Sequence, residues 1–210
     1  MLPSIPDKLL RIDEVTAGDH FSLDATDTCF YVWEYAARRN FSAGPANQLI
    51  KNLKAKPSEL AMTPARQRHK QRALRHAAKA LRQLLGRQAV EGEYSFVPVP
   101  CSKACGDPDH DDRTLRVLQR AFSGWQSDVQ PILRVRHSMA ADHESAERMT
   151  HDDLLALTEA LPPRNPLRRT IVVFDDVLNS GKHFKVAQTL LSAANPDAAI
   201  LGLFLARCIR

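Results

Sequence analysis

The segment Arg169–Phe174 and the residues after it constrain the fold more than any other part of the sequence. Arg169-Thr-Ile-Val-Val-Phe174 is an almost continuous apolar run, which is typical of a strand buried on both faces of a parallel sheet. Asp175 and Asp176 end the run, and a short loop leads into a helix expected over 185–194. Ligands of open parallel sheets bind beyond the carboxyl ends of the strands, so this order of elements predicts a ligand site.

Most of the chain alternates between strand and helix patterns. The expected strands lie at 94–99, 131–135, 169–174 and 198–206, and the expected helices at 113–122, 152–161 and 185–194. Alternation of this kind implies crossover connections and a parallel sheet. Cys29–Tyr35 mixes aromatic and β-branched residues and fits either a strand or a short buried helix. We therefore expect a doubly wound α/β fold with a mainly parallel sheet.

Two helices are expected upstream, over 45–54 and from Pro64 to about Leu85. Thr63 would be the N-cap of the second helix, Pro64 its first residue, and Gly86 its natural stop. These helices suggest an N-terminal helical extension. The expected organisation is an N-terminal segment packing on the core at 1–60, a basic helix at 61–90 and the core at 91–210, all in one domain.

The second of these helices concentrates positive charge. No Asp or Glu occurs between Thr63 and Val90. The basic residues considered for nucleic-acid binding are Arg68, Arg72, Arg75 and Lys79. They form either a solvated face or a contact surface for a protein partner or for the backbone of a nucleic acid, which would be bound independently of sequence and sensitively to salt.

Length and composition bound the class of protein. A chain of 210 residues suits one domain with a sizeable core. Four cysteines are too few for a disulfide scaffold and favour a reduced, cytoplasmic location. We find no secretory signal pattern and no apolar run of membrane-spanning length, so no membrane partner is expected. The formal charge of +5 suits an anionic ligand or a nucleic acid. The oligomeric state is not readable.

The residues after the acidic pair have the chemistry of an anion site. Loop amides at a helix N-terminus bind anions, and a glycine there allows close approach of the backbone. The residues expected to bind phosphate are Val177, Leu178, Asn179, Ser180, Gly181, Lys182 and His183. The acids cannot face a phosphate, so they suit ribose hydroxyls or the surroundings of a magnesium ion.

Asp175-Asp-Val-Leu-Asn-Ser-Gly181 resembles the phosphoribosyl-diphosphate (PRPP) motif of type I phosphoribosyltransferases. The resemblance implies that the two acids hold the ribose hydroxyls, that the loop wraps the 5′-phosphate of PRPP or a nucleotide, and that Mg²⁺ is the cofactor, held indirectly. Asn179 and Ser180 stand where the family has two threonines, and His183 where it usually has another.

The resemblance extends towards the ComF-like branch of this family, over about residues 46–207, although only 171–184 is specific. Phe96-Val-Pro-Val-Pro-Cys-Ser-Lys103 resembles its strand and pyrophosphate loop, and Leu49-Ile-Lys-Asn-Leu-Lys54 is similar to a lysine-bearing helix. The residues that the resemblance assigns to pyrophosphate are Ser102, Lys103, Arg113, Arg134 and Arg148. The cysteine cluster common at the N-terminus of that branch is missing.

Three functions stay open. The first is Mg²⁺-dependent transfer of a phosphoribosyl group to an unknown base or amine with release of pyrophosphate. The second is a regulatory or effector protein of this fold that binds a nucleotide or nucleic acid, for which some bacterial antiviral operons offer an analogy. The third is hydrolysis of a nucleotide N-glycosidic bond in the same pocket.

Overall fold

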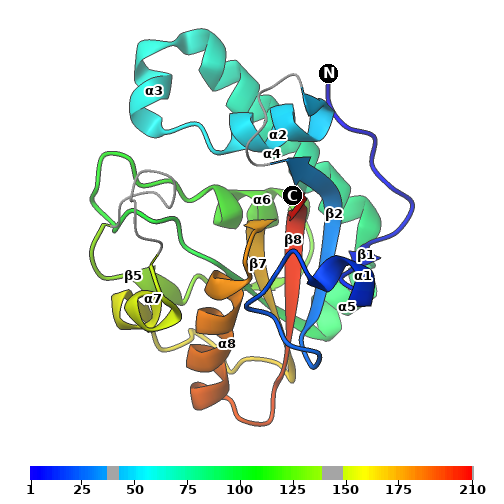
Figure 1. Cartoon of the computed structure of the whole chain (residues 1–210), viewed down its shortest axis with the longest axis vertical. Helices are drawn as coiled ribbons and strands as arrows, with labels where there is room; N and C mark the ends of the chain where they lie inside the picture. The colour runs from blue at the N-terminus through cyan, green and yellow to red at the C-terminus, as the bar shows by residue number, and fades with distance from the viewer. Residues whose placement is uncertain (37–42, 139–148, 210) are drawn as a thin grey trace.

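The computed structural model describes residues 1–36, 43–138 and 149–209 as one mixed α/β arrangement (Figure 1). Its central sheet has six strands in the order β1-β2-β8-β7-β3-β4. The strands are β1 (Leu10–Arg11), β2 (Thr28–Ala36), β3 (Tyr94–Pro98), β4 (Asp128–Val129), β7 (Thr170–Leu178) and β8 (Ala199–Ile209). All neighbours pair in parallel except β1 with β2. The expected α/β fold with a mostly parallel sheet is confirmed.

Helices cover both faces of this sheet. On one face lie α2 (Pro45–Leu53), α4 (Pro64–Leu84), α5 (Arg87–Gly92) and α6 (Arg113–Ala121), and on the other α8 (Lys182–Ala194). Three short helices complete the chain: α1 (Glu14–Ala17), α3 (Pro57–Met62) and α7 (His151–Leu157). The side chains of each face therefore pack into a separate apolar cluster, with the sheet between the two.

Strand β7 lies in the middle of the sheet, between β8 and β3. Val172 and Phe174 belong to the apolar cluster under α4 and α6, whereas Ile171 and Val173 belong to the cluster under α8. Successive side chains of a strand point to opposite faces, and both faces here are covered. The continuous apolar run is thus explained, and the expectation of a strand buried on both faces is confirmed.

The N-terminal segment contributes to the sheet itself. Residues Thr28–Ala36 form β2, which pairs in parallel with β8, so the strand interpretation of Cys29–Tyr35 is confirmed and the helix alternative is wrong. Val32 and Trp33 join the apolar cluster that also contains α2 and α4. The first 60 residues therefore complete one edge of the sheet as well as supplying helices.

The elements expected over 131–135 and 152–161 differ from those observed. The helix expected over 152–161 ends at Leu157, because residues Thr158–Ala160 form β6 and pair antiparallel with β5 (Leu133–Val135). The strand expected near 131–135 therefore belongs to a separate two-stranded sheet and not to the central one. Thr63 occupies the N-cap position of α4, but its side chain makes no capping hydrogen bond.

Helix α4 is a layer of the core rather than a solvated arm. Ala73, Leu74 and Leu81 are almost fully buried and belong to the same apolar cluster as Phe96 and Phe174. The helix packs against α2 and α6. The positions Arg68, Arg72, Arg75 and Lys79 are exposed, on the side of the helix opposite the buried residues.

Replacement of Leu74 by Ala tests this placement of α4. We expect the free energy of unfolding to fall by about 2–5 kcal/mol, because a buried leucine leaves a cavity. The neighbouring exposed residue provides the control, since Arg75→Ala should change it by less than about 0.5 kcal/mol. Urea unfolding followed by circular dichroism measures both. If Leu74→Ala lowered the free energy of unfolding no more than Arg75→Ala does, α4 would not be part of the core.

Candidate functional site

The acidic pair lies near the carboxyl end of β7, inside the protein. Asp175 is 8 % exposed and Asp176 is 3 % exposed. Adjacent strand residues point to opposite faces, and Asp176 is on the side of α2 and α6, where it meets Lys54 and Arg113. One carboxylate oxygen of Asp175 accepts a hydrogen bond from the amide of Asp176 at 2.7 Å. Buried carboxylates need such partners, because desolvation of an unpaired charge is costly.

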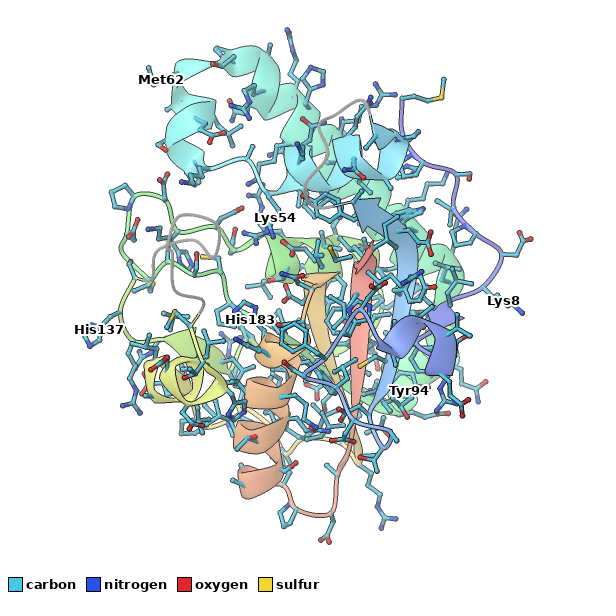
Figure 2. The ribbon with its side chains drawn as sticks, in the orientation of Figure 1. Lys8, Lys54, Met62, Tyr94, His137 and His183 are labelled. Atoms are coloured by element: carbon cyan, nitrogen blue, oxygen red, sulfur yellow. The ribbon has the colours of Figure 1, made fainter. Side chains whose placement is uncertain are left out.

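Asp176 is held by two cations from different helices. The Arg113 Nε, on α6, donates to Oδ2 at 2.5 Å, and the Lys54 Nζ, just after α2, lies 3.5 Å from Oδ1. Lys54 is placed above the end of β7 in Figure 2. Arg113 and Lys54 are separated from Asp176 by 63 and 122 residues of chain. The site is therefore assembled by tertiary packing.

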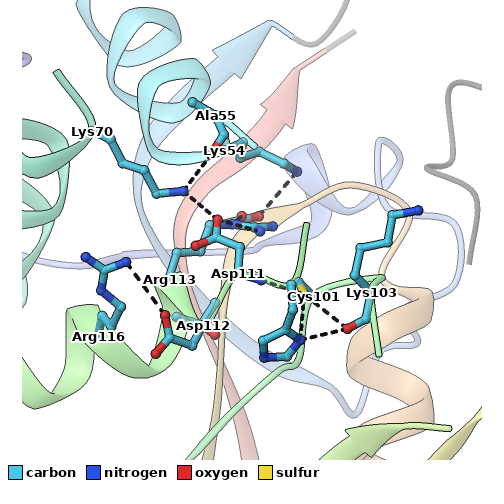
Figure 3. Close-up of polar contacts among 12 residues, drawn as sticks. Lys54, Ala55, Lys70, Cys101, Lys103, Asp111, Asp112, Arg113 and Arg116 are labelled. Atoms are coloured by element: carbon cyan, nitrogen blue, oxygen red, sulfur yellow. Dashed lines mark hydrogen bonds and ion pairs between the residues drawn. The ribbon is translucent and has the colours of Figure 1, made fainter. Parts of the chain in front are cut away.

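The ion pairs continue behind Arg113 in a chain of alternating charge (Figure 3). Arg113 Nη1 lies 3.4 Å from Asp111, and Asp111 accepts from the Lys70 Nζ at 2.6 Å. Lys70, which is 2 % exposed, also donates to the carbonyl of Ala55 at 2.7 Å. Lys70 sits among the buried alanines and leucines of α4, and its ammonium is accommodated because both partners accept hydrogen bonds.

These contacts give the two carboxyls different charge states. Burial raises the pKa of Asp175 to about 7, and the charge of Asp176 acts in the same direction. Burial alone would also raise the pKa of Asp176, but Arg113 and Lys54 hold it below the usual range of a carboxyl. Asp176 is therefore the carboxyl kept ionised, and Asp175 is the carboxyl on which a proton is favoured. The pair can accept hydrogen bonds at one residue and donate or accept at the other.

The loop after the acids is shorter than expected. Residues 177 and 178 lie in β7, because Val177 and Leu178 still pair with Ala206 and Arg207 of β8. The loop is therefore Asn179–Gly181, which we call the 179–181 loop. Gly181 has φ 93° and is the N-cap of α8, a left-handed conformation that favours glycine.

Helix α8 begins three residues earlier than expected, at Lys182. Lys182 and His183 therefore lie in its first turn and not in the loop. The Lys182 Nζ donates to the carbonyl of Met149 at 2.6 Å. His183 is exposed, and with Ser102 it lines a small pocket whose other walls are mostly apolar. The helix N-terminus, the loop amides and His183 thus lie together just beyond the acidic pair (Figure 2).

The residues expected to bind pyrophosphate are dispersed. Lys103 lies in the loop after β3, and its carbonyl accepts a hydrogen bond from His110, while its side chain points away from the ion-pair chain in Figure 3. Arg113 is engaged with Asp176. Arg134 lies on β5 and pairs with Glu159 of β6. Arg148 is outside the described residues.

A direct magnesium site does not fit the acidic pair in this arrangement. Each oxygen of Asp176 already faces a cation, and Mg²⁺ prefers near-octahedral oxygen ligands. Among the residues that the structure describes, no three His, Cys, Asp or Glu side chains gather in one place. A directly bound Mg²⁺ at Asp176 would therefore compete with Lys54 and Arg113 for the same carboxylate oxygens.

Comparison with known proteins assigns the chain to no family. No protein-family model matches the chain, and no curated protein matches it. In the described part of the chain, no helix is long and apolar enough to cross a membrane.

Sequence reasoning assigned no site role to four side chains of this region, although it singled out the segment that ends at Lys54. Asp111, Lys70 and Lys54 belong to the ion-pair chain, and His20 is fully buried against the carbonyl of Asn179. Lys70 carried a usable signal, because a lone cation lies on the apolar face of a predicted helix, and Lys54 ends a segment already compared with a lysine-bearing helix. Asp111 and His20 depend on contacts between residues far apart in the chain.

Replacement of Arg113 by Met tests the ion pair with Asp176. We expect the free energy of unfolding to fall by about 3–5 kcal/mol, because the change leaves a buried carboxylate without its partner. Arg116→Met on the same helix is the control: its partner Asp112 is exposed, and such pairs contribute about 0–1 kcal/mol. Urea unfolding measures the free energy of unfolding of both variants. Similar losses in both variants would contradict the assigned role of Arg113.

Proposed function

We propose that this protein binds a ribose 5-phosphate group, as part of PRPP or a nucleotide, at the carboxyl end of β7. The observation that carries the proposal is the buried pair Asp175–Asp176 followed directly by the 179–181 loop and the N-terminus of α8. Carboxyls recognise sugar hydroxyls, whereas amides at a helix N-terminus recognise a phosphate. The sugar hydroxyls of a ribose 5-phosphate would bind the two carboxyls, and its phosphate would bind the amides of the loop and the helix N-terminus.

The residues have separate proposed roles. Asp176, kept ionised by Arg113 and Lys54, accepts a hydrogen bond from one ribose hydroxyl. Asp175 faces the second hydroxyl and donates or accepts according to its protonation. The amides of the 179–181 loop and the first turn of α8 bind the 5′-phosphate, with Ser180 as an additional donor.

The proposed reaction is phosphoribosyl transfer, as the resemblance to type I phosphoribosyltransferases implies. The bond between C1′ and the pyrophosphate oxygen breaks, a bond from C1′ to the nitrogen of an unknown base or amine forms, and the proton that this nitrogen loses passes to the departing pyrophosphate or to water. Positive charge develops on the ribose, and a fixed carboxylate such as Asp176 stabilises it. Mg²⁺, when bound with the diphosphate, would neutralise part of the negative charge of the leaving group. Of the residues assigned to pyrophosphate, Ser102 and Lys103 in the loop after β3 are the proposed contacts, whereas Arg113 and Arg134 are paired with Asp176 and Glu159.

Hydrolysis in the same pocket differs only in the nucleophile, since water would attack C1′ in place of a base. Incubation with PRPP, and separately with nucleotides, distinguishes the cases by their products. Pyrophosphate released from PRPP only when an acceptor is present supports transfer, whereas free base released from nucleotides supports hydrolysis.

Replacing both acids tests the binding site. We expect Asp175→Ala/Asp176→Ala to weaken PRPP affinity by about 100-fold or more in calorimetry, because hydrogen bonds to charged groups contribute about 1.5–3 kcal/mol each. Asp175→Asn/Asp176→Asn, which preserves shape, should show a comparable loss. Asp112→Asn, which changes an exposed carboxylate on the same side of the sheet, is the control and should bind normally. A folded double variant that retains full PRPP affinity would refute the proposal.

A second candidate is a regulatory or effector protein that also contacts nucleic acid through α4. Arg68, Arg72, Arg75 and Lys79 are exposed on one side of the helix. None of them forms an ion pair with another residue in the described ranges. Four unneutralised cations spaced three or four residues apart match a phosphate backbone.

Charge reversal tests this candidate. The triple variant Arg68→Glu/Arg72→Glu/Arg75→Glu should lose binding to double-stranded DNA or RNA, and wild-type affinity should fall steeply with salt, because binding of phosphates releases counterions. Fluorescence anisotropy at several salt concentrations measures both effects. Absence of wild-type binding at low salt would reject the candidate without affecting the ribose phosphate site.

A further inference from the structure

The N-terminal residues 19–27, which we call the 19–27 segment, lie directly on the 179–181 loop. His20 is fully buried, and its Nδ1 contacts the carbonyl oxygen of Asn179. A carbonyl only accepts hydrogen bonds, so this nitrogen carries the proton and donates. The amide of Ser22 donates to the carbonyl oxygen of Ser180 at 2.9 Å. Figure 1 shows the blue chain after α1 passing across the start of α8.

These two hydrogen bonds fix the direction of the loop amides. In a trans peptide unit the carbonyl and the following N–H point in opposite directions, and no cis peptide bond occurs among the described residues. With the carbonyls of Asn179 and Ser180 held by the 19–27 segment, the N–H groups of Ser180 and Gly181 point to the opposite side of the loop. Neither amide donates to another described residue.

The 19–27 segment is itself anchored to β8, the neighbour of β7 in the sheet, and to α8, which follows the loop. Asp19 pairs with Arg207 of β8 at 3.2 Å. Asp27, whose side chain is fully buried, pairs with Lys185 of α8 at 3.0 Å and accepts from Gln188 of the same helix. The position of His20 over the loop is therefore set by contacts outside the loop.

Gly181 shows how close the contact is. A Cβ placed on this residue would lie 2.8 Å from the Leu23 Cδ2. The left-handed backbone, with φ 93°, already favours glycine at this position, and a Cβ there would also require the Leu23 side chain to shift. The loop and the 19–27 segment are thus fitted to each other.

We propose that His20 is a positioning residue for ribose 5-phosphate, holding the 179–181 loop so that the amides of Ser180 and Gly181 face the 5′-phosphate. The inference rests on the proposed function. It assigns a role to a segment that lies about 160 residues from the loop in sequence, since 159 positions separate His20 from Asn179. His20 does not touch the ligand, and its effect passes through the backbone of the loop.

Calorimetry with ribose 5-phosphate tests the proposal. His20→Phe keeps an aromatic ring but removes the donor, and we expect affinity to fall by about tenfold or more, as for loss of one hydrogen bond to a charged group. His20→Asn retains an N–H donor near the position of Nδ1 and should stay within about threefold of wild type. The matched control is His76→Phe, which removes a hydrogen bond from another histidine to a backbone carbonyl, that of Pro3, far from the loop in sequence, and should bind normally.

Each calorimetric result either supports the role of His20 or counts against it. Wild-type affinity in His20→Phe, or equal losses in His20→Phe and His20→Asn, would overturn the inference while leaving the proposed function intact. A wild-type protein that does not bind ribose 5-phosphate would remove the proposed function and the inference with it. If His20→Phe fails to fold, as judged by circular dichroism, Asp27→Asn loosens the anchor instead. Unchanged affinity in a folded Asp27→Asn protein then counts against the inference.

Discussion

The ion pair between Arg113 and Asp176 is the interaction on which the candidate site depends. It joins α6 to the central strand β7 inside the protein. Two charges removed from water are tolerated only when their hydrogen-bonding groups are satisfied, and Asp111, Lys70 and Lys54 supply the remaining contacts. Because these cations keep Asp176 ionised, the second negative charge is disfavoured on Asp175. The unequal protonation of the two carboxyls thus follows from the packing of α2, α4 and α6 on one face of the sheet.

The opposite face of the sheet carries the part of the site that is proposed to bind phosphate. There α8 supplies a helix N-terminus, and the 19–27 segment covers the 179–181 loop that precedes it. The acidic pair would orient a sugar, and the loop would orient a phosphate, from a rigid strand held between two parallel neighbours. Rigid placement of these groups favours recognition, because it lowers the entropy that binding costs.

The parts of the fold that were predictable are those governed by local pattern. The apolar run before Asp175 predicted β7, and Pro64 and Gly86 predicted the start of α4 and, to within about one residue, its end. Local sequence pattern did not predict the ends of elements that are set by pairing between strands. Strand β7 continues to Leu178 because its last residues still pair with residues of β8. The helix expected over 152–161 ends early because residues 158–160 pair with β5 instead. The acids were identified from their position after a strand. The pairing of Lys54 with Asp176 and the places of Asp111 and His20 were not predicted, because their partners are remote in the chain.

Amide chemical-shift mapping tests the central claim most directly. Titration of the ¹⁵N-labelled protein with ribose 5-phosphate should shift the amide resonances of Ser180 and Gly181, of the first turn of α8 and of Asp175 and Asp176, with one common dissociation constant. The amides of α4 should remain unchanged. Shifts confined to α4, or no shifts in the 179–181 loop at saturating ligand, would contradict the assignment of this loop and acidic pair as a ribose phosphate site.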